Sequence, residues 1–193
     1  VVILNVDLVK RTSGISGILY PHKGIYTEIF KKIRSEKTFF FMRLHLSRCG
    51  AIFTKKGQNG GKMIGAIIGD TIGSIYEFDN IKTKDFDFWG EGIEPTDDSV
   101  LTFATANWLL RGGEAWRHYC DFATEYDNPM GEYGSGFLQF VANARRGGKP
   151  QPYNSCGNGS AMRVGPVGWA FNTMDEVLER ARVSAECSHN HPE

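Results

Sequence analysis

Helix-length apolar segments, each ended by a helix breaker, follow one another from Met63 onward and most constrain how this chain can fold. In residues 98–111, apolar side chains recur at the i, i+3, i+4 spacing of one helix face, and Gly112 and Gly113 then stop the helix. No alternating apolar and polar pattern of convincing strand length occurs after Met63. The sequence therefore predicts an all-α fold. The other predicted helices cover residues 63–78, 114–126, 136–146, 160–171 with an interruption at Gly165 and Pro166, and 174 to about 188 with Thr173 as its cap.

The first 62 residues differ in character from the rest of the chain. They hold 12 Lys and Arg against 3 Asp and Glu, whereas residues 63–193 hold 10 against 19. They also show no periodic amphipathic pattern with caps. We therefore expect an atypical, poorly structured basic N-terminal extension over residues 1–62 and a helical domain over residues 63–193, with Met63 as the natural first residue. The alternative for residues 1–62 is a basic arm that binds an acidic partner.

Charge, cysteine content and hydropathy narrow the class of protein. The acidic balance of residues 63–193 disfavours a nucleic-acid partner, because contacts with phosphates need a basic surface. No apolar run reaches the roughly 20 residues that a membrane span needs, so no membrane association is expected. The four cysteines form no C-x-x-C pair, which is typical of reduced thiols in a cytoplasmic protein.

The run Pro95-Thr96-Asp97-Asp98-Ser99 places a hydroxyl and two carboxylates immediately before an apolar helix. Hard divalent cations such as Mg²⁺ prefer oxygen ligands of this kind. At a helix N-terminus the backbone is not yet helical, so the oxygens of Thr96, Asp97 and Asp98 can converge on one ion. Thr and Asp are also favoured N-caps, so an acidic capping turn is the alternative explanation.

Two further acids lie on the glycine-spaced helix that begins at Met63. Asp70 and Glu77 are seven residues apart and therefore project from nearly the same helix face. A carboxylate among apolar residues is costly unless it is paired or binds a metal. The alternative is that Asp70 only bonds to backbone groups and that Glu77 ends the helix in solvent.

Residues 155–160 read Ser-Cys-Gly-Asn-Gly-Ser and precede a predicted helix. Gly and Asn tolerate left-handed backbone, so successive N–H groups here can form a nest for an anion such as a pyrophosphate. No Gly-Lys-Ser/Thr follows, which excludes a P-loop. A tight turn without a ligand is the alternative.

The chain ends with Cys187, His189 and His191 in close succession. Cys and His are zinc ligands, but no second pair with ligand spacing accompanies them. A hydrogen-bonding role for His189 beside a substrate is the preferred interpretation, and an exposed helix end is the other alternative.

Taken together, these motifs resemble those of the ADP-ribosylglycohydrolase family, from Met63 to Glu193. Each motif is weak alone, but the ordered set is highly specific. In chain order, the motifs are Gly69-Asp70-Thr71-Ile72-Gly73 with Ser74-Ile75-Tyr76-Glu77, then Thr96-Asp97-Asp98-Ser99, then Gly157-Asn158-Gly159-Ser160-Ala161-Met162-Arg163, and last Ser188-His189 with His191-Pro192.

The resemblance implies an all-α fold with a dinuclear Mg²⁺ site in a cleft. It assigns Thr96, Asp97 and Asp98 to the first group of metal ligands, and Glu77 to a metal-binding or water-activating role. His189 would contact the substrate. The loop that would hold the diphosphate and distal ribose of ADP-ribose consists of Tyr153, Asn154, Ser155, Cys156, Gly157, Asn158 and Gly159, with Ser160 next to it. Some relatives carry an aromatic residue where this chain has Cys156.

The resemblance also implies the reaction, the hydrolysis of the bond between ADP-ribose and a protein side chain or small molecule. Asp97 or Glu77 would act as general base. The family's second metal-ligand motif, Asp-x-Asp-Thr/Ser, does not follow His191-Pro192 here. We therefore expect this chain to be an N-terminal portion of such a hydrolase. The alternatives are a non-catalytic module that binds ADP-ribose and a fragment without function of its own.

Overall fold

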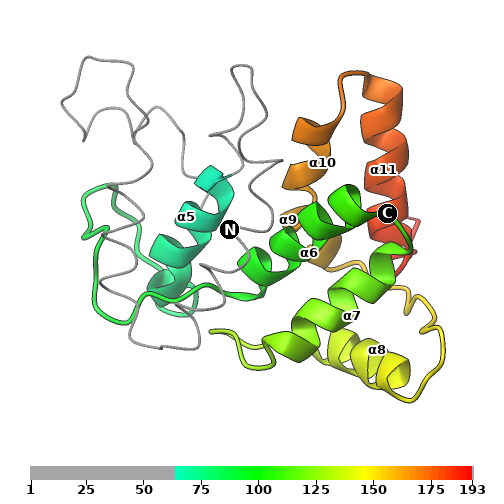
Figure 1. Cartoon of the computed structure of the whole chain (residues 1–193). Coiled ribbons are helices and arrows are strands. Elements are labelled where there is room, and N and C mark those ends of the chain that lie inside the picture. Colours follow the sequence, from blue (N-terminus) through cyan, green and yellow to red (C-terminus); the bar gives the residue numbers. More distant parts are fainter. Residues whose placement is uncertain (1–63, 193) are drawn as a thin grey trace.

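The computed structural model describes residues 64–192, which form a succession of helices (Figure 1). The predicted extension over residues 1–62 and the predicted start at Met63 lie outside the described residues. An isolated parallel bridge between Thr96 and Met130 is the only β pairing within residues 64–192, so the all-α prediction is confirmed. The helices are α5 (Ile64–Gly73), α6 (Asp97–Arg111), α7 (Ala115–Glu125), α8 (Ser135–Arg145), α9 (Gly159–Met162), α10 (Gly165–Ala170) and α11 (Met174–Glu186), with the 3₁₀ helix η1 (Ser74–Tyr76) directly after α5.

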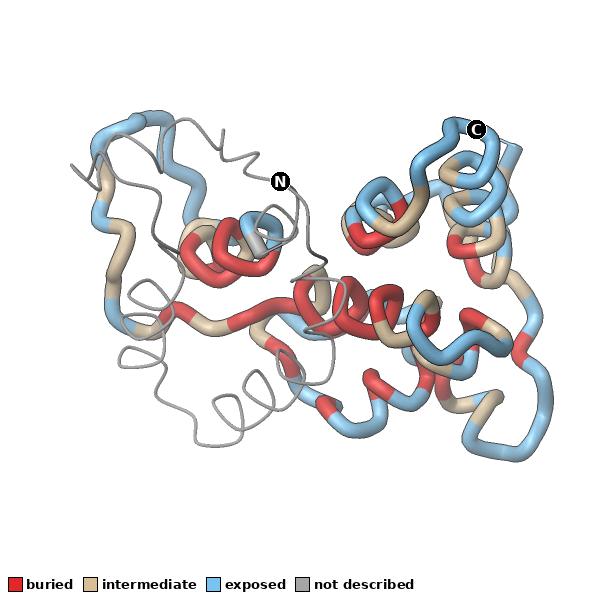
Figure 2. Tube along the Cα trace, turned by 45° about the horizontal axis from the view of Figure 1, so that its top comes forward, coloured by how far each residue is buried: buried red, intermediate tan, exposed pale blue. Residues whose placement is uncertain are grey.

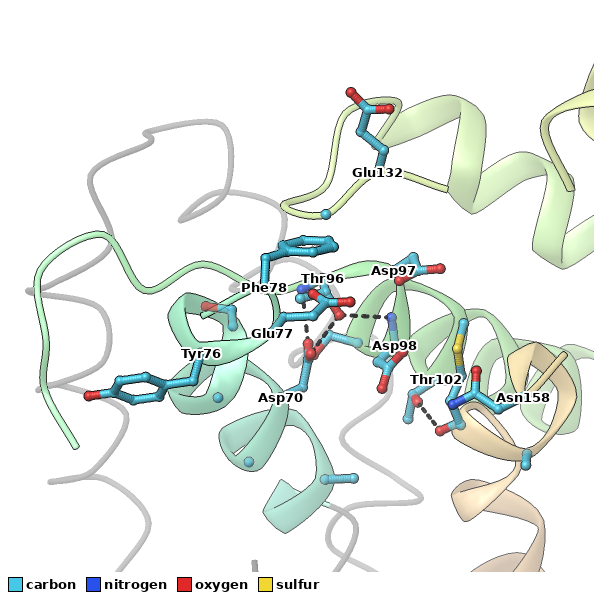
Figure 3. A pocket seen from close by; sticks show the side chains of 18 of the residues that line it. Asp70, Tyr76, Glu77, Phe78, Thr96, Asp97, Asp98, Thr102, Glu132 and Asn158 are labelled. Carbon is cyan, nitrogen blue, oxygen red and sulfur yellow. Dashed lines mark hydrogen bonds between the residues drawn. The ribbon is translucent and has the colours of Figure 1, made fainter. Parts of the chain in front are cut away.

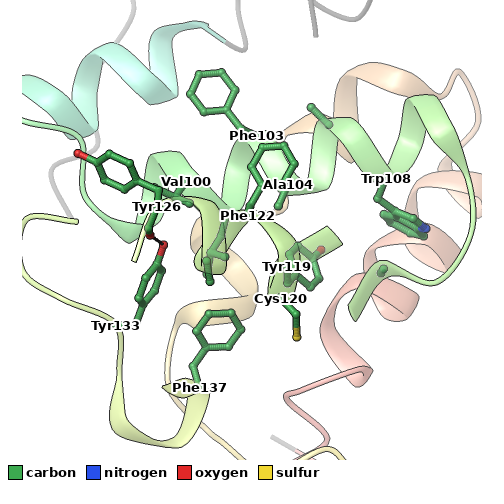
Figure 4. Close-up of a cluster of buried hydrophobic side chains, with 14 of the residues drawn as sticks. Val100, Phe103, Ala104, Trp108, Tyr119, Cys120, Phe122, Tyr126, Tyr133 and Phe137 are labelled. Atoms are coloured by element: carbon green, nitrogen blue, oxygen red, sulfur yellow. Dashed lines mark hydrogen bonds between the residues drawn. The ribbon is translucent and has the colours of Figure 1, made fainter. Parts of the chain in front are cut away.

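Helix α6 is the centre of the core and packs against α5, α7 and α10. It forms a nearly continuous buried run in Figure 2, and Val100, Phe103 and Ala104 are fully inaccessible to solvent. Figure 4 shows rings from α7 and α8 gathered on one side of it. The buried hydroxyl of Thr105 donates a hydrogen bond to Leu101 O at 3.0 Å, so this polar group is satisfied inside the helix.

Two predicted helices differ from those in the structure. The helix predicted to reach residue 78 changes to the tighter η1 after Gly73, where Ser74 Oγ bonds back to Thr71 O at 2.9 Å. The helix predicted over residues 160–171 is two short helices, α9 and α10. The break comes before Pro166, near the N-terminus of α10, because proline has no N–H with which to continue a helix. The predicted cap of α11 is confirmed, since Thr173 Oγ1 accepts a hydrogen bond from Glu176 N.

The described residues also show the length of the helices relative to a membrane and the state of three cysteines. None of the helices in residues 64–192 combines the length and the hydropathy needed to cross a membrane. Cys120, Cys156 and Cys187 are free thiols.

Candidate functional site

Asp70 on α5 ties the start of α6 to that helix. Its Oδ2 accepts hydrogen bonds from Thr96 N at 2.9 Å and from Ser99 Oγ at 2.5 Å, and its Oδ1 accepts one from Thr96 Oγ1 at 2.5 Å. Thr96 is the N-cap of α6, because its hydroxyl accepts a hydrogen bond from Asp98 N at 3.2 Å. The capping function of Thr96 is thus confirmed, and a carboxylate 26 residues earlier in the chain holds the cap in place.

Thr96 Oγ1 retains one position for a further ligand. A hydroxyl oxygen has one hydrogen to donate and two lone pairs that accept. The hydrogen goes to Asp70, and one lone pair takes the N–H of Asp98. The second lone pair can face a cation, so capping and cation binding are compatible at this residue.

A cleft of about 740 Å³ lies beside the starts of α6 and α9 (Figure 3). The charged side chains among the described residues that line it are all carboxylates, with no lysine, arginine or histidine. Figure 3 shows Glu77 and Asp98 close to Thr96, whereas the side chain of Asp97 points away from Asp70. The acidic residues of this wall are Asp70, Glu77, Asp97, Asp98 and Glu132.

Burial raises the pKa values of four of these carboxyl groups, those of Asp70, Glu77, Asp97 and Asp98. Burial raises the pKa of Asp97 to about 7, and the neighbouring carboxylates act in the same direction. Burial also raises the pKa of Asp70 to about 6, against the lowering effect of hydrogen bonds from Ser99 and Thr96. The pKa values of Glu77 and Asp98 are raised by burial as well. A cation bound among these carboxylates would lower all four values.

The chemistry of the wall fits a hard divalent cation. Carboxylate and hydroxyl oxygens are the ligands that Mg²⁺ prefers, and no basic side chain from the described part of the cleft wall competes for them. The arrangement is open, because no three His, Cys, Asp or Glu side chains within residues 64–192 gather closely enough to enclose a metal ion. The predicted ligands Thr96, Asp97, Asp98 and Glu77 therefore share one cleft without forming a closed coordination site.

The predicted substrate loop lies mostly beside the cleft. Of residues 153–160, only Asn158 lines it. The left-handed backbone that Gly and Asn were expected to tolerate within residues 155–160 occurs instead at Asn154, with a φ of 54°, while Asn158 has a φ of −77°. Gly157 and Gly159 have no positive φ either, so an anion nest on the Gly157–Gly159 backbone was a wrong expectation for this conformation.

His189 packs against both ends of this loop. The Tyr153 ring lies 5.7 Å from the imidazole, centroid to centroid. A Cβ on Gly159 would lie 3.0 Å from His189 Nε2, so a side chain at this position would require the ring to shift by a few tenths of an ångström. The backbone joins the same segments, since Tyr153 N donates to Ser188 O at 3.1 Å and Asn154 N donates to the Asn190 side chain at 2.7 Å. His189 does not line the acidic cleft, so the structure brings it to the loop but not to the carboxylates.

The zinc alternative at the end of the chain does not hold within the described residues. No group of His, Cys, Asp and Glu that could hold a metal forms there. The Cys187 thiol donates to Ser184 O at 3.3 Å, and burial raises its pKa, which disfavours the thiolate that zinc needs.

The sequence of this chain is similar to those of known proteins. The model of the ADP-ribosylglycohydrolase family matches residues 60–193, which include every residue of the cleft, the loop and the His189 segment. The chain belongs to the ADP-ribosylglycohydrolase family.

Curated relatives of this ADP-ribosylglycohydrolase chain include the ADP-ribosylhydrolase ARH3 of several vertebrates. The Mus musculus protein is 29% identical over 163 residues, covering 67% of this chain and 43% of the relative. The Homo sapiens protein is 29% identical over 163 residues, covering 67% of this chain and 44% of the relative. The Danio rerio protein is 29% identical over 158 residues, covering 67% of this chain and 42% of the relative. The chain thus spans less than half the length of these relatives. No solved structure matches it.

The sequence did not indicate that the loop before α8 contributes to the acidic cleft. Gly131, with a φ of 81°, lies against Glu77, and a Cβ there would be 2.9 Å from Glu77 Oε2. Glu132, with a φ of 63°, adds a fifth acid to the wall. The only sequence signal was the turn composition around Asn128, Pro129 and Gly131, which predicts a loop but not its neighbours.

Proposed function

We propose that this chain forms part of a Mg²⁺-dependent hydrolase that cleaves the glycosidic bond between ADP-ribose and an acceptor. The acceptor would be a protein side chain or a small molecule. The observation that carries the proposal is the acidic cleft, which Glu77, Thr96, Asp97 and Asp98 line together with no basic residue among the described lining residues. Family membership and the similarity to ADP-ribosylhydrolases support the same reaction class.

Thr96, Asp97, Asp98 and Glu77 would hold the cation, with two ions expected in the complete protein. A bound Mg²⁺ would supply Lewis acidity and orient ribose hydroxyls and water. Asp70 would keep the ligand turn in place, because it bonds both the backbone and the side chain of Thr96.

Asp97 or Glu77 would accept the proton of the attacking water. Both carboxyl groups line the cleft in which this water would be held, and a positioned carboxylate can serve as general base. The carboxylates of the cleft would also stabilise the positive charge that develops on the ribose in an oxocarbenium-like transition state.

The loop from Tyr153 to Ser160 and the His189 side chain would bind the ADP-ribose part of the substrate. This group lies mostly outside the acidic cleft and is held together by its own contacts. That separation favours a second candidate function, a module that binds ADP-ribose without turnover. The three free thiols support a cytoplasmic setting for either function.

Turnover and binding assays separate these functions. We expect a complete hydrolase that contains this chain to release ADP-ribose from ADP-ribosylated peptides only with Mg²⁺, and to lose this activity in Asp97→Ala and Asp98→Ala. Asp85→Asn, an exposed acid outside the cleft, is the matched control. Unchanged activity in both alanine variants would refute the site assignment. Calorimetric binding of ADP-ribose without any release would establish the binding module instead.

A further inference from the structure

Arg163 is a fully buried cation at the end of α9. Its guanidinium lies 3.9 Å from the centroid of the Tyr119 ring, and no salt bridge within residues 64–192 includes it. Its Nη2 donates to Ser184 O at 2.7 Å and to Ser188 Oγ at 2.8 Å. A buried arginine without a carboxylate is costly.

The bond from Arg163 fixes the direction of the next hydrogen bond. A guanidinium can only donate, so Ser188 Oγ is the acceptor from Arg163 and keeps its single hydrogen for another partner. His189 Nδ1 lies 2.8 Å from Ser188 Oγ and can accept that hydrogen. The Cys187 thiol does not compete for it, because it is 4.0 Å from Ser188 Oγ and donates its own hydrogen to Ser184 O.

An imidazole that accepts at Nδ1 is neutral and carries its hydrogen on Nε2. The same Nε2 faces the loop, because it lies 3.0 Å from the position of a Cβ on Gly159. Burial, with a smaller contribution from the Arg163 charge, lowers the pKa of His189 to about 4, so the ring is neutral at physiological pH.

We propose that Arg163 and Ser188 are positioning residues that hold His189 in the Nε2–H tautomer, so that it presents a hydrogen-bond donor to an oxygen of ADP-ribose in the Gly157–Gly159 loop. The ligand, but not the tautomer, rests on the function proposed above. A ribose hydroxyl and a phosphate oxygen both accept such a bond, and ribose-5-phosphate and ADP tested as separate ligands distinguish the two sources.

Nuclear magnetic resonance of the ¹⁵N-labelled full chain at pH 7 tests the tautomer directly. Long-range ¹H–¹⁵N correlation should show one histidine as the Nε2–H tautomer, assigned by its loss in His189→Gln. Ser188→Ala should convert this residue to a mixture of tautomers. Ser184→Ala, which removes an equally buried hydroxyl from the same segment but keeps the Arg163–Ser188–His189 chain, should leave the tautomer unchanged. A wild-type Nδ1–H tautomer, or an unchanged spectrum of His189 in Ser188→Ala, would overturn the proposal.

Calorimetry with ADP-ribose tests the consequence for binding. Ser188→Ala should weaken ADP-ribose binding about fivefold, the effect of one hydrogen bond of about 1 kcal/mol, while Ser184→Ala should not. An equal affinity in wild type and Ser188→Ala would overturn the donor role of His189. Absence of ADP-ribose binding in wild type, with the expected tautomer in the spectra, would refute the proposed function and leave the assignment of Arg163 and Ser188 intact.

Discussion

Replacing Asp70 with asparagine should change how the stability of this protein depends on pH. The Asp70 carboxyl has its pKa raised from 3.8 to about 6, because burial outweighs the hydrogen bonds from Ser99 and Thr96. A raised folded-state pKa means that the folded protein holds this proton more tightly than the unfolded chain. The stabilisation by the protonated group is complete below pH 3.8 and is lost as the pH rises through about 6.

The size of this effect follows from the two pKa values. A difference of about two pKa units corresponds to about 3 kcal/mol at 1.36 kcal/mol per unit. Other groups titrate in the same range, and His189, whose folded-state pKa is lowered, acts in the opposite direction. The contribution of Asp70 is therefore measured as the difference in the free energy of unfolding between wild type and Asp70→Asn. We expect the wild-type free energy of unfolding, relative to that of the variant, to fall by about 2–2.5 kcal/mol between pH 4 and pH 7, because part of the total of about 3 kcal/mol is already lost at pH 4.

Urea unfolding at half-unit pH steps in the presence of EDTA measures this difference. Asp85→Asn is the control, since Asp85 is exposed and does not line the cleft, and its curve should remain parallel to that of wild type. A constant difference between wild type and Asp70→Asn across pH 4 to 7 would refute the buried environment assigned to Asp70. An increasing difference would mean that the hydrogen bonds outweigh burial.

Three further predictions concern other parts of the structure. Gly131→Ala and Gly92→Ala both place alanine at a positive φ, 81° and 85°, and each should lower the stability by about 1 kcal/mol. Only Gly131→Ala should also weaken Mg²⁺ binding measured by calorimetry, because its Cβ would meet Glu77, whereas a Cβ on Gly92 would face open space. Phe103→Ala should lower the free energy of unfolding in urea by about 3–5 kcal/mol, since the ring is fully buried, and a loss below about 1 kcal/mol would contradict this core position. Thr173→Ala should cost about 1 kcal/mol by loss of the α11 cap, whereas Thr173→Ser should restore the stability.

The helices could be predicted from the sequence because their signals are local. Thr96 and Thr173 mark helix starts through their own side chains, and both predicted boundaries agree with the structure to within one residue. The break near Pro166 was also visible, although its effect on the length of α9 was not. Where a local preference competes with packing, as at Gly73, the sequence predicts the helix but not its change to a 3₁₀ turn.

The site was harder to predict because it depends on contacts between distant residues. The sequence indicated that Asp70 needs a partner, but not that Thr96 and Ser99 supply it. It indicated left-handed backbone within residues 155–160, where Gly and Asn occur, but the residue that adopts this conformation is Asn154, just before them. The contribution of Gly131 required knowledge of the fold, because the loop before α8 meets Glu77 only in three dimensions.

The distribution of charge connects the two groups of site residues. The cleft holds carboxylates without a basic residue among its described lining residues, while Arg163, whose charge acts on His189, is buried and bonded to neutral acceptors. Neither group offers the exposed positive charge that a diphosphate ordinarily requires. If ADP-ribose binds here, a cation in the acidic cleft must offset the repulsion between the carboxylates and the phosphates. Cation and ligand would then each raise the affinity for the other by the same factor, because coupling between two binding equilibria is reciprocal. The buried arginine contributes in another way, by orienting a neutral donor rather than by attracting the anion.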